Sequence, residues 1–185
     1  MVAKVLASAI VTGLLLNATA STAQTTARGP ALAADSSFIV TAGSLGLLQV
    51  QLGTVAVQKG SSPAVKEFAR RMVAEYSTVN EQLAAGAKQA AYPSPVILRQ
   101  HQTILDRFRS TGGSSFDKKY MAEMTNELGE AARLFQQESE HGRVTSLKDL
   151  ASTLLPTVQQ HATFATETAR SAGVEEVTAE VGQGN

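Results

Sequence analysis

Three polar side chains interrupt apolar stripes that recur at helical spacing along this chain. They are Gln49, Tyr76 and His161, and each lies about midway along a predicted helix. If these helices pack side by side, the three groups can converge, and an amide, a phenol and an imidazole could then handle protons or satisfy one another. Glu75 and Glu127 lie beside the inner stripes, and we expect them to face a groove or solvent.

The residue types at these mid-helix positions favour a packed polar core over a metal centre. A stable transition-metal site needs three or four strong ligands, whereas Gln49, Tyr76, Leu128 and His161 offer one imidazole. We therefore predict no metal, no cofactor and no catalytic residue. His161 is expected to form a hydrogen bond with Gln49 or Tyr76, because buried polar groups need partners.

One further spacing is typical of metal chemistry. Glu138 and His141 have the Glu-x-x-His spacing of di-iron carboxylate proteins, but a second copy of that motif is missing from the sequence. The pair precedes Gly142 in the last turn of a predicted helix, where a histidine commonly complements the helix dipole. His101, on the stripe of another helix, is interpreted as a packed or rim residue.

Composition excludes several classes of protein. The chain lacks cysteine, which rules out disulfides, thiolate metal sites and cysteine nucleophiles. Its 16 basic and 16 acidic residues cancel, so the charge balance argues against nucleic acid as a partner. Neither a glycine-rich phosphate loop nor a Gly-x-Ser-x-Gly motif occurs. The expected partner is an unidentified protein or small molecule.

The N-terminus has the layout of a secretory signal. Lys4 precedes a short apolar run, and small residues follow it up to Ala20 and Ala23, either of which can end the signal. We predict a signal peptide over residues 1–23 and a flexible mature N-terminus over 24–34. The alternative, an uncleaved anchor, is disfavoured because the run is shorter than a membrane helix. The mature chain is therefore expected to be periplasmic or otherwise exported, without a transmembrane segment.

The remaining residues predict a helical domain over 35–173, followed by a flexible tail over 174–185. Asp35 is expected to cap the first helix, which ends at Gly60 in a position that favours a left-handed cap. Ser62 and Pro63 form a helix-start signal for the second helix, which runs to about Ala91. Close approach of the first helix to a neighbour is expected at Gly46 and Gly53, which lie on one side of it.

Three more helices are predicted in the second half of the chain. Ser94 and Pro95 are expected to start a short third helix, and Ser114 with Asp117 resembles a capping box for the fourth. The fifth runs over residues 145–172, with a bend before Pro156. Four long helices and a short extra one between the second and fourth predict an all-α, antiparallel four-helix bundle.

Five stretches carry a resemblance to a known family: residues 38–42 (FIVTA), 49–53 (QVQLG), 65–73 (VKEFARRMV), 116–120 (FDKKY) and 155–161 (LPTVQQH). In this order they resemble the domain of unknown function 4142 family, and the resemblance covers nearly all of residues 35–172. It implies an exported bacterial protein, predicted to belong to the outer membrane or periplasm, with a ferritin-like helical bundle. It implies no defined biochemical activity.

The resemblance also shows where this chain departs from its family. The family commonly has a glutamate in place of Gln49, and aspartate–histidine pairs in place of Glu75-Tyr76 and Glu127-Leu128, so that His161 alone matches. One carboxylate with three imidazoles would suit a metal or proton-handling site, and here that set is dismantled.

Two functions therefore stand as predictions. The first is an exported, non-enzymatic helical bundle of undefined biochemical role, associated through binding with the cell envelope or with stress. The alternative is a ferritin-like metal-binding or oxidoreductase protein that uses His161 with Glu75, Glu127 or Gln49.

Overall fold

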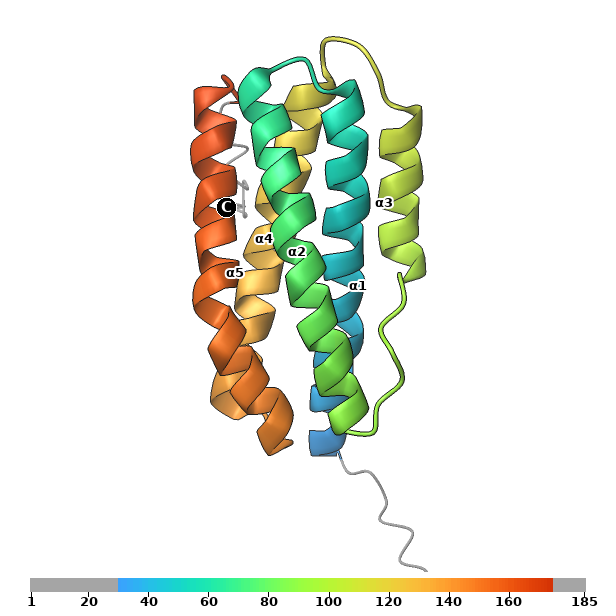
Figure 1. Ribbon diagram of the computed structural model, residues 1–185, viewed down its shortest axis with the longest axis vertical. Coiled ribbons are helices and arrows are strands. Elements are labelled where there is room, and N and C mark those ends of the chain that lie inside the picture. Colours follow the sequence, from blue (N-terminus) through green and yellow to red (C-terminus); the bar gives the residue numbers. More distant parts are fainter. Residues whose placement is uncertain (1–29, 175–185) are drawn as a thin grey trace, which may run out of the picture.

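The computed structural model describes residues 30–174, and side chains from Ala33 onward. This part of the chain contains five helices and no strands (Figure 1). The helices are α1 (Pro30–Lys59), α2 (Pro63–Gln89), α3 (Arg99–Ser110), α4 (Phe116–His141) and α5 (Thr145–Ser171). The all-α prediction is confirmed for these residues.

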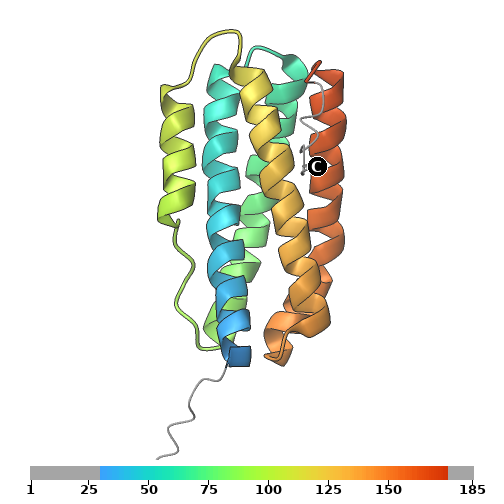
Figure 2. The same cartoon turned by 180° about the vertical axis from the view of Figure 1, so that it is seen from behind.

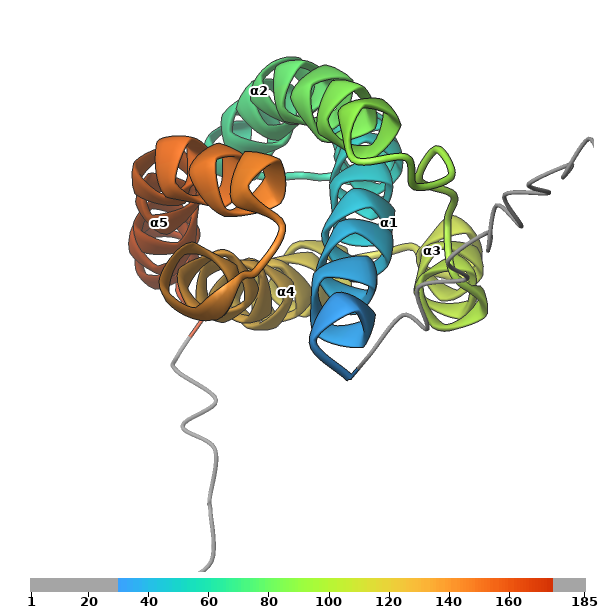
Figure 3. The same ribbon diagram turned by 90° about the horizontal axis from the view of Figure 1, so that it is seen from below.

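Helices α1, α2, α4 and α5 surround one core, and α3 lies outside against α1 (Figure 3). The neighbouring pairs are α1 with α2, α4 with α5, α2 with α5 and α1 with α4. Figures 1 and 2 show that the two members of each pair run in opposite directions, whereas α2 and α4 run in the same direction. In sequence, the segment that contains α3 connects α2 to α4, and it returns the chain from one end of the molecule to the other.

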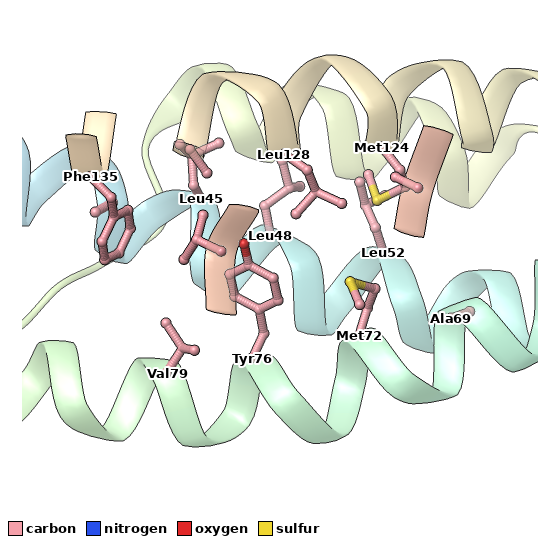
Figure 4. Packing of buried hydrophobic residues seen from close by; sticks show 14 of the residues in the cluster. Leu45, Leu48, Leu52, Ala69, Met72, Tyr76, Val79, Met124, Leu128 and Phe135 are labelled. Atoms are coloured by element: carbon pink, nitrogen blue, oxygen red, sulfur yellow. The ribbon is translucent and has the colours of Figure 1, made fainter. Parts of the chain in front are cut away.

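The predicted apolar stripes form one continuous core. Aromatic pairs lie near both ends of it: the Phe38 and Phe135 rings meet edge to face with centroids 5.2 Å apart, and the Phe116 and Tyr120 rings stack at 6.0 Å. Leucine, valine, alanine and methionine side chains from α1, α2, α4 and α5 fill the space between them (Figure 4). Burial of these stripes supplies the main driving force for packing the helices.

The sequence predicted that Asp35 caps the first helix, and this prediction is wrong. Helix α1 begins earlier, at Pro30, so Asp35 lies inside it. Its Oδ1 instead accepts the backbone N–H groups of Arg143 and Val144, at 2.8 and 3.0 Å, immediately before α5. The carboxylate therefore satisfies free donors at the start of a different helix.

Asp117 behaves in the same way. The predicted capping box at Ser114 is wrong, because the N-cap of α4 is Ser115 and its side chain makes no capping hydrogen bond. Both Asp117 oxygens accept from the backbone N–H of Ser61, at 3.0 and 3.1 Å, and Oδ2 accepts from Ser62 at 2.7 Å. Asp117 thus joins the start of α4 to the start of α2.

The other helix boundaries divide into confirmed and corrected ones. Ser62 and Pro63 begin α2 as predicted. The start at Ser94-Pro95 is wrong, because α3 begins at Arg99 with Leu98 as its N-cap. Helix α1 does end before Gly60, but that glycine lacks the positive φ of a left-handed cap. Its N–H instead bonds Ala56 O at 2.8 Å, which extends the helical pattern.

Two local predictions about helix shape are supported. The ribbon of α5 changes direction in the half that follows the α4–α5 turn, and Pro156 lies inside this helix (Figure 1). Gly46 and Gly53 face α2 at close range: a Cβ at Gly53 would lie 2.8 Å from Val73 Cγ2, and one at Gly46 would lie 2.0 Å from Asn80 Oδ1. Larger side chains would force α1 and α2 apart.

Several predictions about the chain ends fall outside the described residues. The signal peptide over 1–23 is one of them, as is the tail beyond Val174. Val174 itself is buried, and its N–H bonds Ala169 O at 2.9 Å. Helix α1 is long and apolar enough to cross a membrane from Ala33 to Lys59, but 61% of its most apolar window is buried against the other helices. A core helix has the same composition.

Candidate functional site at the centre of the helices

The four central positions predicted from the sequence are all buried. Gln49, Leu128 and His161 are fully enclosed and Tyr76 is 1% exposed. They come from α1, α4, α5 and α2, so each surrounding helix contributes one. Apolar spacing placed them on the inner faces, and the packing of those faces brings them into the core.

Their levels along the molecule also agree. Gly46 of α1 faces Asn80 of α2, and Gly53 faces Val73, so that Gln49 lies at the level of Tyr76 in this antiparallel pair. The Tyr76 and His161 rings are tilted against each other, with centroids 5.0 Å apart. Figure 4 shows the Tyr76 ring crossing the core from α2, with its hydroxyl oxygen toward the leucines of α1 and α4.

The hydrogen bond of His161 differs from the predicted one. Its Nε2 pairs with Oε2 of Glu75, and not with Gln49 or Tyr76. Glu75 therefore turns toward α5 while 36% of its side chain stays exposed, so the expected exposure is retained and the bond to His161 is an addition to it. Its Oε1 accepts from Arg71 Nε at 2.7 Å, and the Arg71 guanidinium lies over the Phe164 ring, 4.6 Å from its centroid. This chain of contacts connects the half-exposed Arg71 to the fully buried imidazole.

Opposing effects set the charges in this chain. Partial burial alone would raise the pKa of the Glu75 carboxyl, but hydrogen bonds from Arg71 and His161 outweigh burial and lower it. The pKa of His161 lies below its ordinary value because burial disfavours the imidazolium more than Glu75 favours it. The pair is therefore best described as a neutral imidazole whose Nε2–H donates to a carboxylate.

Polar atoms at this level remain without protein partners. Both amide atoms of Gln49, the Tyr76 hydroxyl and His161 Nδ1 are buried, and none forms a hydrogen bond with the described residues. Mutual satisfaction of these three side chains, which the sequence suggested, is therefore not observed. Burial also raises the pKa of the Tyr76 phenol, so this group is neutral at any ordinary pH.

The donor set does not fit a transition metal. His161 is the one imidazole at this level, its Nε2 is already bound, and both Glu75 oxygens are engaged. Across residues 30–174, no group of three or more histidine, aspartate or glutamate side chains could hold a metal ion. The Glu-x-x-His pair is likewise split, since Glu138 is buried and His141 is exposed.

Glu127 belongs to a separate cluster that joins α1, α3 and α4. Its Oε2 lies 3.9 Å from Nε2 of His101, which is 3% exposed, and His101 Nδ1 lies 2.6 Å from Ser44 Oγ. Ser44 Oγ also accepts the Leu98 backbone N–H at 2.7 Å. Burial, and then the charges of Glu123 and Glu130, raise the pKa of Glu127 to about 7. Burial lowers the pKa of His101. The cluster ties α3 to the other helices.

Comparison with known proteins assigns the chain to a family. A family model described as "Domain of unknown function (DUF4142)" matches residues 19–168. The chain belongs to the DUF4142 family. This confirms the resemblance, and the family description names no activity. Neither the curated proteins nor the solved structures contain a match to this DUF4142 chain.

Two participants in these DUF4142 clusters were not singled out from the sequence. Arg71 lies four residues before Glu75, a spacing that predicts an ion pair on one helix face and could have drawn attention to it. Ser44 lies among apolar neighbours on α1. Its partner is 57 residues away, and no local pattern could have identified it.

Proposed function

We propose that this chain is an exported helical protein that works by binding a partner and not as an enzyme. The observation that carries the proposal is the pairing of His161 with Glu75, whose second oxygen is bound by Arg71. The two side chains at the centre that could bind a metal strongly, Glu75 and His161, are thereby engaged within the protein. The centre is then a structural feature of the core, and neither a metal site nor a redox site.

The proposed architecture is an antiparallel four-helix bundle of ferritin-like topology. The support is the order of the helices, with one long connection between α2 and α4, which run in the same direction (Figure 1). A single long crossover is typical of ferritin-like bundles. In this proposal the chain keeps the scaffold without its ligands, because Gln49, Tyr76 and Leu128 occupy positions where ligands would otherwise project.

The proposed location is the periplasm or another exported compartment, with a role at the cell envelope or under stress. The apolar run after Lys4 and the small residues up to Ala23 support export. The balanced charge supports a protein or small molecule as the partner in preference to nucleic acid.

Metal binding tests the proposal directly. The purified mature protein is incubated with zinc, manganese or iron, and its metal content and melting temperature are measured. We expect less than one bound ion per chain and an unchanged melting temperature, since a ligand stabilises the state that binds it. In His161→Leu, too, the metal content should stay below one ion per chain and added metal should not change the melting temperature.

Exposed histidines can bind metal weakly, and His141→Ala controls for this because its side chain is 78% exposed. A rise in melting temperature that survives His141→Ala and disappears in His161→Leu would overturn the proposal. That result would support the ferritin-like metal-binding function instead.

A further inference from the structure

Two buried carboxyl groups meet where α1 lies against the α4–α5 turn. Asp35 of α1 is fully enclosed and Glu138 of α4 is 5% exposed. Asp35 Oδ1 is satisfied by the backbone N–H groups of Arg143 and Val144. Neither carboxyl group forms an ion pair with a cation of the described residues. Acidic side chains are rarely this buried without a paired charge.

The two side chains reach the same short turn. Asp35 Oδ1 binds the N–H groups of residues 143 and 144, and Glu138 Oε1 lies against Gly142. Asp35 Oδ2 and Glu138 Oε1 are buried, and neither has a hydrogen-bond partner among the described residues. Two ionised carboxylates are acceptors alone and would repel each other in this enclosed space, whereas one shared proton would let one carboxyl group donate to the other. The placement therefore favours a carboxylic acid beside a carboxylate.

We propose that Asp35 and Glu138 share one proton and form a pH-sensitive clasp, which holds α1 on the α4–α5 turn in mildly acidic solution and releases it in alkaline solution. On release the proton passes to water and leaves two adjacent negative charges. Because Asp35 also binds the two N–H groups before α5, its displacement loosens three elements together.

The groups around the pair support this assignment. Lys148 of α5 is the cation whose charge reaches Glu138, but its Nζ bonds the Glu140 carbonyl oxygen at 3.0 Å. His141 and Glu140 lie exposed at the end of α4. Gly142 closes the site on the turn side, where a Cβ would lie 2.6 Å from Glu138 Oε1. No neighbour among the described residues therefore replaces the proton.

The pKa shifts of Glu138 and Asp35 determine how the stability of the clasp changes with pH. Burial, and then Asp35, raise the pKa of Glu138 to about 7. Its stabilising contribution is thus complete below its ordinary value of 4.5 and is lost as pH rises through about 7. Burial would raise the pKa of Asp35, but the N–H groups of Val144 and Arg143 outweigh burial and lower it. Its contribution persists until pH falls through that lowered value, so the clasp is strongest in mild acid.

Release would change a hollow at this end of the molecule. A hollow of about 430 Å³ is lined by Ala34, Phe38 and Leu134, with Glu138 on its wall. Two of these residues belong to the first turns of α1, which the clasp holds in place. Movement of α1 would widen the hollow and expose the Phe38 ring.

Melting temperature as a function of pH tests the clasp. In the mature protein we expect a fall of about 3–6 °C between pH 5.5 and 8.5, beyond that of the matched variant Glu138→Gln. The amide of Glu138→Gln donates to Asp35 without titrating, so the melting temperature of this variant should keep only the pH dependence of the other groups, such as Glu127, whose pKa is also about 7. Glu140→Gln, an exposed change two residues away, should follow the wild type. Equal pH dependence in Glu138→Gln and wild type would overturn the proposal.

A second measurement uses the unaltered protein, and so does not depend on folding of the variant. The side-chain carboxyl carbon of Glu138, followed by NMR, should titrate near pH 7, and hydrogen exchange at the Arg143 and Val144 amides should accelerate above that pH beyond the intrinsic rate. Titration near 4.5 would contradict the clasp. A calcium- or zinc-dependent rise in melting temperature at pH 8, absent from Glu138→Gln, would show that a cation and not a proton joins the pair.

Discussion

Gln49 has the least satisfied side chain in the described core. Its amide oxygen and nitrogen are both buried, and neither has a hydrogen-bond partner among residues 30–174. An amide buried in this way costs free energy that an apolar side chain of similar size would not. Packing alone would therefore favour an apolar side chain over glutamine at this position.

Replacing Gln49 with leucine is expected to stabilise the protein by about 1 kcal/mol, since it removes two unsatisfied polar atoms at nearly constant volume. Gln49→Ala is the matched control and should destabilise by about 1–3 kcal/mol because it leaves a cavity. Denaturant unfolding measures both. A loss of stability in Gln49→Leu would show that the amide is satisfied within the core, for instance by an ordered water.

The pairing of Glu75 with His161 predicts that two glutamates of α2 contribute unequally to stability. Glu75→Ala leaves the Nε2–H of a fully buried imidazole without an acceptor, and should cost about 1–3 kcal/mol. Glu67→Ala removes an exposed ion pair with Arg70 on the same helix and should cost less than about 0.5 kcal/mol. Similar losses for the two variants in denaturant unfolding would argue against a structural role of the Glu75–His161 pair.

At the scale of the helices, glycine positions decide how closely α1 and α2 approach. Gly53→Ala would place a Cβ 2.8 Å from Val73 Cγ2 and 3.0 Å from the Ala69 carbonyl oxygen. We expect a loss of about 1–3 kcal/mol from overpacking, although alanine favours helix. At Gly129 of α4 no atom lies within 4 Å of an added Cβ. Gly129→Ala should therefore stabilise by about 0.5–1 kcal/mol. Thermal unfolding of the two variants should shift in opposite directions.

Capping between helices gives another prediction at this scale. Asp117→Ala removes the acceptor for the backbone N–H groups of Ser61 and Ser62, and should destabilise by about 1–2 kcal/mol. Ser114→Ala tests the local capping box that the sequence suggested, and should be nearly neutral. A large effect at Ser114 with none at Asp117 would contradict the observed hydrogen bonds. Denaturant unfolding separates the two outcomes.

At the scale of the whole molecule, the prediction concerns export. The Lys4 signal and the small residues after the apolar run predict cleavage after Ala20 or Ala23 and a soluble periplasmic product. Intact mass of the protein recovered from the periplasm measures the new N-terminus. A mass that still includes Met1 would contradict cleavage. Recovery in the membrane fraction would instead indicate that an apolar segment acts as an anchor.

The sequence by itself determined which helices form and which side chains point inward. Spacing of three and four residues identified the inner faces, and it placed Gln49, Tyr76, Leu128 and His161 in the core before any packing was known. Ser62-Pro63 and Gly142 marked helix ends correctly because these signals act within a single turn. The family resemblance was also readable from motifs, since these are properties of the chain alone.

Only the tertiary structure decided which groups meet. A short carboxylate can satisfy N–H groups of its own helix or of another, and local sequence does not distinguish the two cases. Packing placed Asp35 at the start of α5 and Asp117 at the start of α2. It also turned Glu75 toward His161 across 86 residues of chain. Periodicity defines the direction of a side chain around one helix, whereas its partner depends on the axial register between helices, which long-range packing sets.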